Sequence, residues 1–431
     1  MTGLNQQLID FLNKSHSDFN VVKNEKEMLL EAGFEELLES KMWTLQAGKK
    51  YFLTRNSNTI LAFKIPEKID HLKFSICASH NDSPAFKLKD NPTVFGRYQK
   101  LKVESYGGLI QSTWLDKPLS VAGRLLVEKS GKVYEKIIDI DKNLAIIPNV
   151  CIHQNRNINN GFVYNNEIDM MPIVGLGEGN LIEQAIEKEL DFGERIISQD
   201  LYLYNRDKAD FVGVNDDFIC SPRLDDLSAN FVSLKAFIDA KNVNTISFFV
   251  AFANEESGSE SYSGADSNIL NIVLKRIIYC LGYETEELYA ALRRSFMLSV
   301  DNGHAIHPNH PEFSDVDHPV VLNGGVVIKF NTNMRYTTDA ISAAVVKALA
   351  ERIGVPTQDF YNRADMKGGS TLGNISMKHV SILTADIGLP QLAMHSNYET
   401  MGSKDTHYLY DLCKKYYETN IRIKEGEFEI D

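Results

Sequence analysis

Hydrophobic and polar positions follow two different patterns along the chain. Up to about residue 91, and again from about residue 216, short apolar runs are separated by longer amphipathic stretches. The runs predict strands at 51–55, 59–65, 73–79, 245–253, 294–300 and 379–386, and the amphipathic stretches predict helices at 4–15, 24–39, 227–241, 268–282 and 339–354. This alternation indicates an α/β fold with a largely parallel central sheet that helices cover on both faces.

The middle of the chain has a different pattern. From residue 92 to 215, polar residues alternate with β-branched and aromatic ones, and Gly107-Gly108, Pro118 and Ser130-Gly131 mark turns. That pattern is typical of antiparallel hairpins. We therefore expect two domains: a discontinuous α/β domain of residues 1–91 and 216–431, and an inserted β-rich domain of residues 92–215. The second N-terminal helix is expected to begin at Asn24, since Asn24 and Glu27 have the spacing of a capping box.

Composition narrows the classes of function. The 431 residues include 45 basic and 58 acidic ones, a net charge of -13 that gives no support to binding of nucleic acid or of an anionic membrane. The first twenty residues do not resemble a signal peptide, and no apolar run approaches the roughly 20 residues of a membrane span. The five cysteines are scattered and form no C-x-x-C pair, as expected of reduced thiols in a cytoplasmic protein.

Polar residues follow several of the predicted strands at the point where each strand ends. In a parallel sheet, ligands gather beyond these carboxyl ends. The residues found there, or in the loop before the helix at 227–241, are His80, Asp82, Asp225, Asp226, Glu255, Glu256, Asp301 and His395. Each one alone fits a helix cap or a solvated turn. Together they predict a site, because polar termini on apolar strands are costly to bury without partners.

Imidazole and carboxylate groups without thiolates suit hard and borderline divalent cations. Two such ions carry a charge of +4, which three ligating carboxylates and one shared hydroxide would neutralise. We therefore expect two divalent metal ions per subunit, and these ligands accept zinc, cobalt and manganese alike.

Eight ordered segments carry a resemblance to a known family. They are SHNDSPAFKLK (79–89), STWLDKPLSVAGR (112–124), CIHQNRNINNG (151–161), SPRLDDL (221–227), NEESGS (254–259), VDNGHAIHPNHPE (300–312), RADMKGGSTLG (363–373) and GLPQLAMHSNYE (388–399). With these segments the chain resembles the aspartyl aminopeptidase and aminopeptidase I family of dinuclear zinc exopeptidases. The resemblance implies a zinc exopeptidase-like fold with an inserted dimerisation domain, and an enzyme that removes the N-terminal residue of peptides. It also implies a large homo-oligomer, commonly a dodecamer built from dimers.

The resemblance also implies a role for each residue of the predicted site. Asp225 would bridge the two metals, His80 and Asp301 would complete one metal site, and Glu256 and His395 would complete the other. Glu255 would be the general base, and Asp82 would fix the ring of His80, although an Asx-turn explains Asp82 as well. A cis peptide bond is implied between Asp225 and Asp226.

Further residues are assigned by the resemblance to the substrate. They are His153, Lys329, Asp365, Met366, Gly369 and Ser370. His153 would reach the active site of a neighbouring subunit, but it can also be interpreted as a metal ligand or as a plain loop histidine. A surface lysine and a glycine-rich loop are the simpler interpretations of the others.

Three histidines spaced three apart, His304, His307 and His310, resemble helical zinc ligands, but Pro308 and Pro311 forbid a regular helix through them. We expect His304 and His307, like Asp226, to lie beside the ligands and His310 to be solvated. The glycines of Gly175–Gly179 do not fit a nucleotide fingerprint.

Two alternatives to an aminopeptidase remain. The same metals could serve a carboxypeptidase or N-deacylase, which would need an arginine clamp such as Arg335 or Arg363. A catalytically silent assembly or cargo-binding protein would be expected to have lost ligands, whereas this chain keeps all of them. The preferred N-terminal residue of the substrate, acidic or neutral, stays open.

Overall fold

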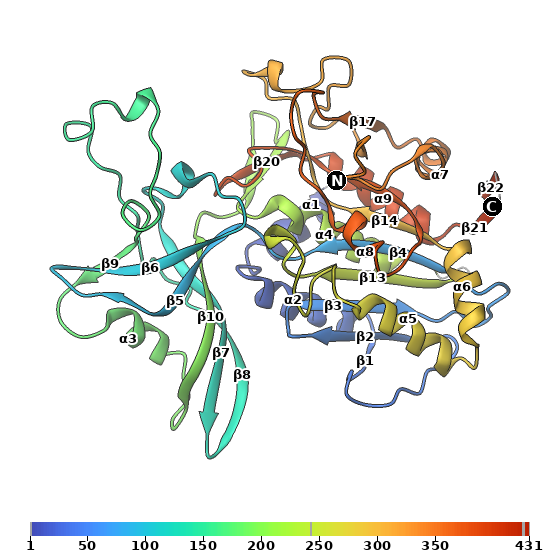
Figure 1. Ribbon diagram of the computed structural model, residues 1–431, viewed down its shortest axis with the longest axis horizontal. Helices are drawn as coiled ribbons and strands as arrows, with labels where there is room; N and C mark the ends of the chain where they lie inside the picture. The colour runs from blue at the N-terminus through green and yellow to red at the C-terminus, as the bar shows by residue number, and fades with distance from the viewer. Residues whose placement is uncertain (1, 242–243, 425–426, 431) are drawn as a thin grey trace.

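The computed structural model describes residues 2–241, 244–424 and 427–430. A nine-stranded mixed sheet forms the centre of the α/β unit, on the right of Figure 1. Its order is β1 (Glu35–Glu36), β2 (Lys50–Arg55), β3 (Thr59–Lys64), β13 (Ile246–Phe252), β4 (Phe74–His80), β14 (Phe296–Val300), β18 (Leu383–Gly388), β16 (Val326–Phe330) and β17 (Thr357–Tyr361). The four strands from β13 to β18 are parallel, while the β2–β3, β3–β13 and β16–β18 pairs are antiparallel. The largely parallel α/β prediction is therefore confirmed.

Helices cover both faces of this sheet. Successive residues of its buried strands point to opposite sides, and since both sets are apolar, each face needs a cover. Phe249 and Ala251 of β13 join one hydrophobic core, and Phe248 and Val250 join the other. The first core is closed by α1 (Thr2–Leu12), α2 (Asp18–Glu31), α4 (Leu224–Asp239), α7 (Ala340–Ile353) and α9 (Asp405–Tyr417). The second is closed by α5 (Ile269–Cys280), α6 (Thr285–Arg294) and α8 (Leu372–Ser376).

The predicted start of the second helix is wrong. Helix α2 begins at Asp18, and the side chain of Ser17 caps it by accepting a hydrogen bond from the main-chain N–H of Asn20. Asn24 lies inside the helix, where its amide group instead donates to the carbonyl of Lys14 and to Ser15. The helix ends at Glu31, because Gly33 adopts a φ of 79° that helical residues do not share.

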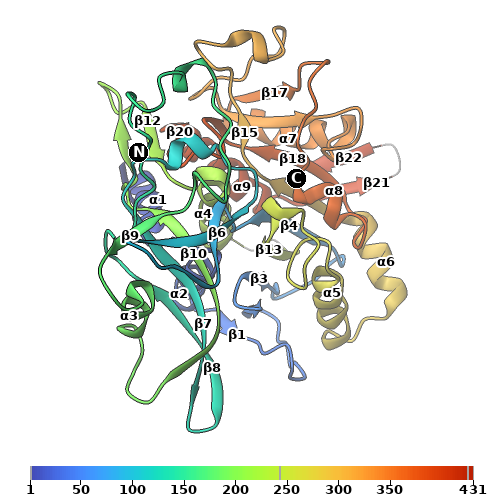
Figure 2. The same cartoon turned by 60° about the vertical axis from the view of Figure 1, so that its left-hand side comes forward.

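A six-stranded antiparallel sheet forms the β-rich unit, on the left of Figure 1. Its order is β8 (Lys132–Asp139), β7 (Leu119–Lys129), β10 (Arg195–Asn205), β5 (Ala85–Val94), β6 (Tyr98–Tyr106) and β9 (Ile173–Leu176). It has its own hydrophobic core, to which α3 (Leu181–Glu187) contributes Ile182 and Ile186. The tip of the hairpin of β7 and β8 points away from the α/β unit (Figures 1 and 2), while Glu135 of β8 accepts the hydroxyl of Ser57 from the turn between β2 and β3. A pattern of short hairpins thus gives a compact second unit.

A small five-stranded sheet lies beside the central one. Its order is β11 (Asp210–Val212), β12 (Phe218–Ser221), β20 (Glu399–Gly402), β19 (Pro390–Leu392) and β15 (Gly303–His304). A C-terminal hairpin of β21 (Ile421–Lys424) and β22 (Glu427–Ile430) completes the strands, and four short 3₁₀ turns lie at η1 (Gln111–Trp114), η2 (Ile158–Asn160), η3 (Glu255–Ser257) and η4 (Pro311–Phe313). Within the described ranges, the helices are all too short or too polar to cross a membrane.

Candidate metal centre

Three neighbouring parallel strands bring the predicted residues to one edge of the sheet. His80 is the last residue of β4 and lies opposite Phe252, the last residue of β13. Asp301 directly follows β14, and Glu255 and Glu256 form the turn η3 just beyond β13. Because these strands are parallel, their carboxyl ends meet at the same edge, as the sequence pattern predicts.

Two irregular segments bring the remaining residues to this edge. Asp225 lies at the start of α4, where the peptide bond between Asp225 and Asp226 is cis, as predicted. His395 lies in the hairpin between β19 and β20 and has a φ of 65°. These residues line one cavity, which we call the front cavity; its other lining residues are Asn302, Gly303, His304, Lys329, Tyr336, Phe360, Gly369, Ser370, Thr371 and Met394.

Distances between the side chains fit two metal ions that share one carboxylate. The ligand atoms of His80, Asp225 and Glu256 lie within 4.8 Å of one another, and so do those of Asp225, Asp226 and Asp301. Asp225 belongs to both groups. Its Oδ1 lies 3.5 Å from His80 Nε2, and its Oδ2 lies 3.4 Å from the Nε2 of His395, which belongs to neither group. Glu256 Oε2 lies 3.3 Å from His395 Nε2. Donors about 2.1 Å from one tetrahedral ion lie about 3.4 Å apart, so the observed spacing fits.

Both histidines present the ring nitrogen that a metal would need. The Nδ1–H of His80 donates to the main-chain oxygen of Asp82 at 3.1 Å, and the Nδ1–H of His395 donates to the carbonyl of Gly108 at 2.8 Å. These bonds leave each Nε2 as an unprotonated donor facing Asp225. The imidazoles are therefore oriented for metal binding.

The carboxylates of the site carry more negative charge than their protein partners compensate. Asp225 Oδ1, Asp226 Oδ2 and Glu256 Oε1 are buried without a hydrogen-bond partner in the described part of the chain. Burial raises the pKa of Glu255 to about 8, and the charges of Asp301 and Asp82 add to the shift. Burial also raises the pKa of Glu256 and of Asp301. Buried oxygen atoms without partners in a cluster of carboxylates fit bound cations.

Asp82 contacts more of the site than the prediction names. Its carboxylate lies 3.4 Å from the Nδ1 of His80, but the main-chain carbonyl is nearer to that nitrogen. The two carboxylate oxygens instead accept the main-chain N–H groups of Glu255 and Glu256, each at 3.1 Å, and Oδ2 also accepts the hydroxyl of Tyr106 at 2.6 Å. Asp82 thus holds the turn that carries both glutamates.

The predicted substrate residues divide into two groups. Lys329, Gly369 and Ser370 line the front cavity, and Lys329 Nζ lies 3.4 Å from Asp301 Oδ1. Asp365 and Met366 do not line it: Asp365 is exposed and forms an ion pair with Arg363 at 2.8 Å. Neither Arg363 nor Arg335 lines the cavity, so the clamp expected of a carboxypeptidase is not found there.

Of the predicted histidines outside the ligand set, one lies in the front cavity and the others do not. His304 lines the front cavity and packs edge-on against Phe360. His307 does not reach it; this side chain is exposed, and its Nδ1 accepts the main-chain N–H of Asn309. His310 is exposed, as expected. His153 is exposed in a loop of the β-rich unit and is not among the residues that line the cavity.

Two features of the site are absent from the sequence-based prediction. Gly107 and Gly108, which the pattern marks only as a turn, touch the centre: a Cβ on Gly107 would lie 3.1 Å from Cβ of Glu256, and Gly108 binds His395. Glu399, the first residue of β20, is buried and accepts the main-chain N–H groups of Asp225 and His395. The sequence offers two signals for Glu399: it lies four residues after His395, and it is the last residue of a segment that resembles the family.

Comparison with known proteins identifies the family. The sequence model described as "Aminopeptidase I zinc metalloprotease (M18)" matches residues 11–417. The chain belongs to this family. It is 40% identical over 422 residues to the probable M18 family aminopeptidase 2 of Clostridium novyi, covering 95% of this chain and 98% of the relative. It is 36% identical over 424 residues to the protein of the same name from Pseudomonas aeruginosa, covering 96% and 98%.

Solved structures of similar proteins share this fold. The cryo-EM structure of the Ape4 and Nbr1 complex contains a chain that matches with a TM-score of 0.92 and 34% identity, over 96% of this chain and 85% of that one. The S. cerevisiae mApe1 dodecamer matches with a TM-score of 0.82 and 26% identity, over 96% of each chain. This M18 chain is therefore a metallo-aminopeptidase of a zinc-dependent family.

Proposed function

We propose that this M18 chain hydrolyses the N-terminal residue of peptides at a dinuclear zinc centre. The observation that carries the proposal is the position of Asp225, whose two oxygens face different histidines. His80 and Asp301 would complete one metal site with Asp225, and Glu256 and His395 would complete the other. Asp226, whose Oδ2 is buried without a partner, lies close enough to Asp301 to support the first.

Glu255 is the general base of this proposal. Bound divalent ions would supply Lewis acidity, which acidifies water and polarises the scissile carbonyl. Glu255 lines the front cavity beside Glu256 but belongs to neither group of potential ligands. Its carboxylate takes a proton from the attacking water and returns it to the leaving amine. Asp82 keeps that carboxylate in place through the main-chain N–H of Glu255.

Lys329, Gly369 and Ser370 are proposed to bind the substrate from the wall of the front cavity. Lys329 is 3% exposed, and its ammonium group is the cation nearest to Asp301 among the described lining residues. Asp365 and Met366 do not line this cavity, and we propose no role in substrate binding for them.

A larger assembly is part of the proposal. The β-rich unit, predicted as residues 92–215, would join subunits into a homo-oligomer, and the related mApe1 of S. cerevisiae forms a dodecamer. His153 lies exposed on a loop of this unit and would contact the substrate of a neighbouring subunit.

One experiment tests the activity. A panel of aminoacyl chromogenic amides is incubated with the purified protein after chelation, and then with zinc, cobalt or manganese added back. We expect release of at least one amine, its loss in chelator and its return with metal. Cleavage of N-acylated or C-terminal substrates in place of these amides would favour the deacylase or carboxypeptidase alternative. No chelator-sensitive release from any substrate would favour a silent assembly protein.

A further inference from the structure

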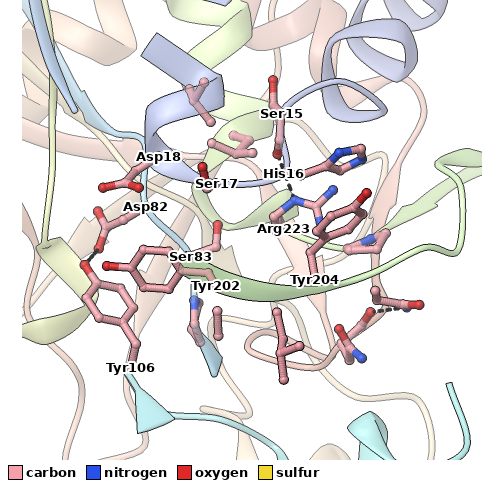
Figure 3. A pocket seen from close by; sticks show the side chains of 18 of the residues that line it. Ser15, His16, Ser17, Asp18, Asp82, Ser83, Tyr106, Tyr202, Tyr204 and Arg223 are labelled. Carbon is pink, nitrogen blue, oxygen red and sulfur yellow. Dashed lines mark hydrogen bonds between the residues drawn. The ribbon is translucent and has the colours of Figure 1, made fainter. Parts of the chain in front are cut away.

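A second cavity lies behind the metal ligands, and we call it the rear cavity. The turn between α1 and α2, the tyrosines of the β-rich sheet and Arg223 line it, and Figure 3 shows the carboxylates of Asp18 and Asp82 on one wall. The front and rear cavities share no lining residue. Asp82 and Glu399 both line the rear cavity and not the front cavity, where the substrate would bind.

Glu399 connects two ligands that come from distant parts of the chain. It is 1% exposed. Its Oε1 accepts the main-chain N–H of His395 at 2.7 Å, and its Oε2 accepts that of Asp225 at 3.1 Å. One carboxylate thus holds the main chain at both Asp225 and His395.

The main chain at both ligands needs such a partner. His395 has a φ of 65°, a left-handed conformation that is uncommon for a residue with a side chain. Asp225 has φ -83° and ψ 111°, so it does not belong to the regular hydrogen-bond ladder of α4. The N–H groups at the start of a helix lack partners within the helix, and a buried N–H needs an acceptor elsewhere. Glu399 is that acceptor for both residues.

Asp82 makes the same type of contact on the other side of the site, where its carboxylate accepts the N–H groups of Glu255 and Glu256. The site is thus held from the rear by two buried carboxylates. Asp82 holds the predicted base and one ligand, whereas Glu399 holds the predicted bridging ligand and His395.

We propose that Glu399 is a positioning residue that fixes the spacing between Asp225 and His395, and through it the affinity of the centre for metal. Glu399 does not line the front cavity, so it would not touch the substrate. The inference rests on the proposed metal centre. It adds a specific requirement: metal affinity depends on a carboxylate with two acceptor oxygens at this position.

The variant Glu399→Gln tests the role. The amide keeps the shape of the side chain but has a single acceptor oxygen, so either Asp225 or His395 loses its main-chain hydrogen bond. Outer partners of metal ligands typically change metal affinity by about 10–100-fold when mutated, and we expect a loss in this range. Metal-free protein is titrated with zinc in competition with a chromophoric chelator, which measures affinity without an activity assay. The visible spectrum of the cobalt-loaded variant reports the change in ligand geometry.

Asp405 offers a matched control. It begins α9, is fully buried, and accepts the main-chain N–H groups of Asn323 and Gly325 at 2.6 and 3.0 Å. It does not line the front cavity. Asp405→Asn therefore removes the same kind of bond away from the metal ligands. We expect this variant to lose thermal stability but to bind zinc as the unmodified protein does.

The outcomes separate the two proposals. If the unmodified protein binds two zinc ions and Glu399→Gln binds them within threefold of the same affinity, the role of Glu399 is refuted and the metal centre stands. Equal weakening by Asp405→Asn would also refute it, since the loss would then be general. If the unmodified protein does not bind two ions, the dinuclear centre itself fails. If Glu399→Gln does not fold, Glu399→Asp replaces it; its shorter side chain should weaken zinc binding relative to the unmodified protein, and an affinity within threefold would refute the role of Glu399.

Discussion

Replacing Glu255 by glutamine should separate proton transfer from metal binding. Glu255 lines the front cavity beside Glu256, but only Glu256 belongs to a group of potential ligands. The amide has nearly the shape of the carboxylate, and the main-chain bond from Glu255 to Asp82 does not involve the altered group. The variant should therefore fold, bind the same amount of metal and lose only the base.

The size of the effect follows from the role of the group. A general base contributes typically 10²–10⁴-fold to the rate, which corresponds to about 2.7–5.5 kcal/mol of transition-state free energy. The assay compares kcat of metal-replete Glu255→Gln with that of the unmodified protein on the best aminoacyl amide of the panel. Metal content is measured on the same samples.

Glu260 provides the control, because it lies in the same acidic segment but is exposed and does not line the front cavity. Glu260→Gln should leave kcat unchanged. The assignment of Glu255 as the base is refuted if Glu255→Gln keeps more than about a tenth of the rate with its full metal content. Loss of metal from this variant would instead make Glu255 a ligand.

Three further predictions concern the support of the site, its pH dependence and its assembly. Gly107→Ala should lower activity and thermal stability together, because Gly107 has a φ of 72° and a Cβ there would lie 3.1 Å from Glu256; an unchanged melting temperature and rate would contradict this. Burial raises the pKa of Glu25 from 4.5 to about 8, so the contribution of Glu25 to folding stability should fall as pH rises from 4.5 to 8, by about 5 kcal/mol. Glu25→Gln should remove that contribution, so that its stability in urea unfolding falls less steeply with pH than that of the unmodified protein, and an unchanged pH profile would refute it. Light scattering should show a large oligomer, in which His153→Ala lowers kcat/KM; a monomer with full activity would exclude a role in trans.

The sequence predicts the strand-end residues well, for a physical reason. Parallel strands must end at the same edge, so His80, Glu256 and Asp301 are brought together by topology alone, without any knowledge of side-chain contacts. The apolar run before each of them stops there and so marks the end of the strand. The start of a helix is harder to predict where two nearby residues could each cap it. Ser17 and Asn24 are both good helix caps, and only the packing of the turn at 15–18 decides for Ser17.

Contacts between distant segments could not be predicted. Gly107 and Gly108 have the pattern of an ordinary turn, and their role comes from the fact that this turn lies against Glu256 and His395. Glu399 is similar, because nothing local shows that its two oxygens face two ligands. The resemblance to the family names ligands and substrate residues, and it names Asp82 as a support of His80, but it gives no role to Gly107, Gly108 or Glu399.

Metal stoichiometry tests the central claim most directly. Metal-free protein is titrated with zinc while the release of chromophore from an aminoacyl amide and the bound metal are both measured. The account predicts that activity is absent without metal and reaches its maximum at two zinc ions per chain, one on each side of Asp225. Full activity in the presence of chelator, or a maximum at one ion per chain that a second ion does not change, would contradict it.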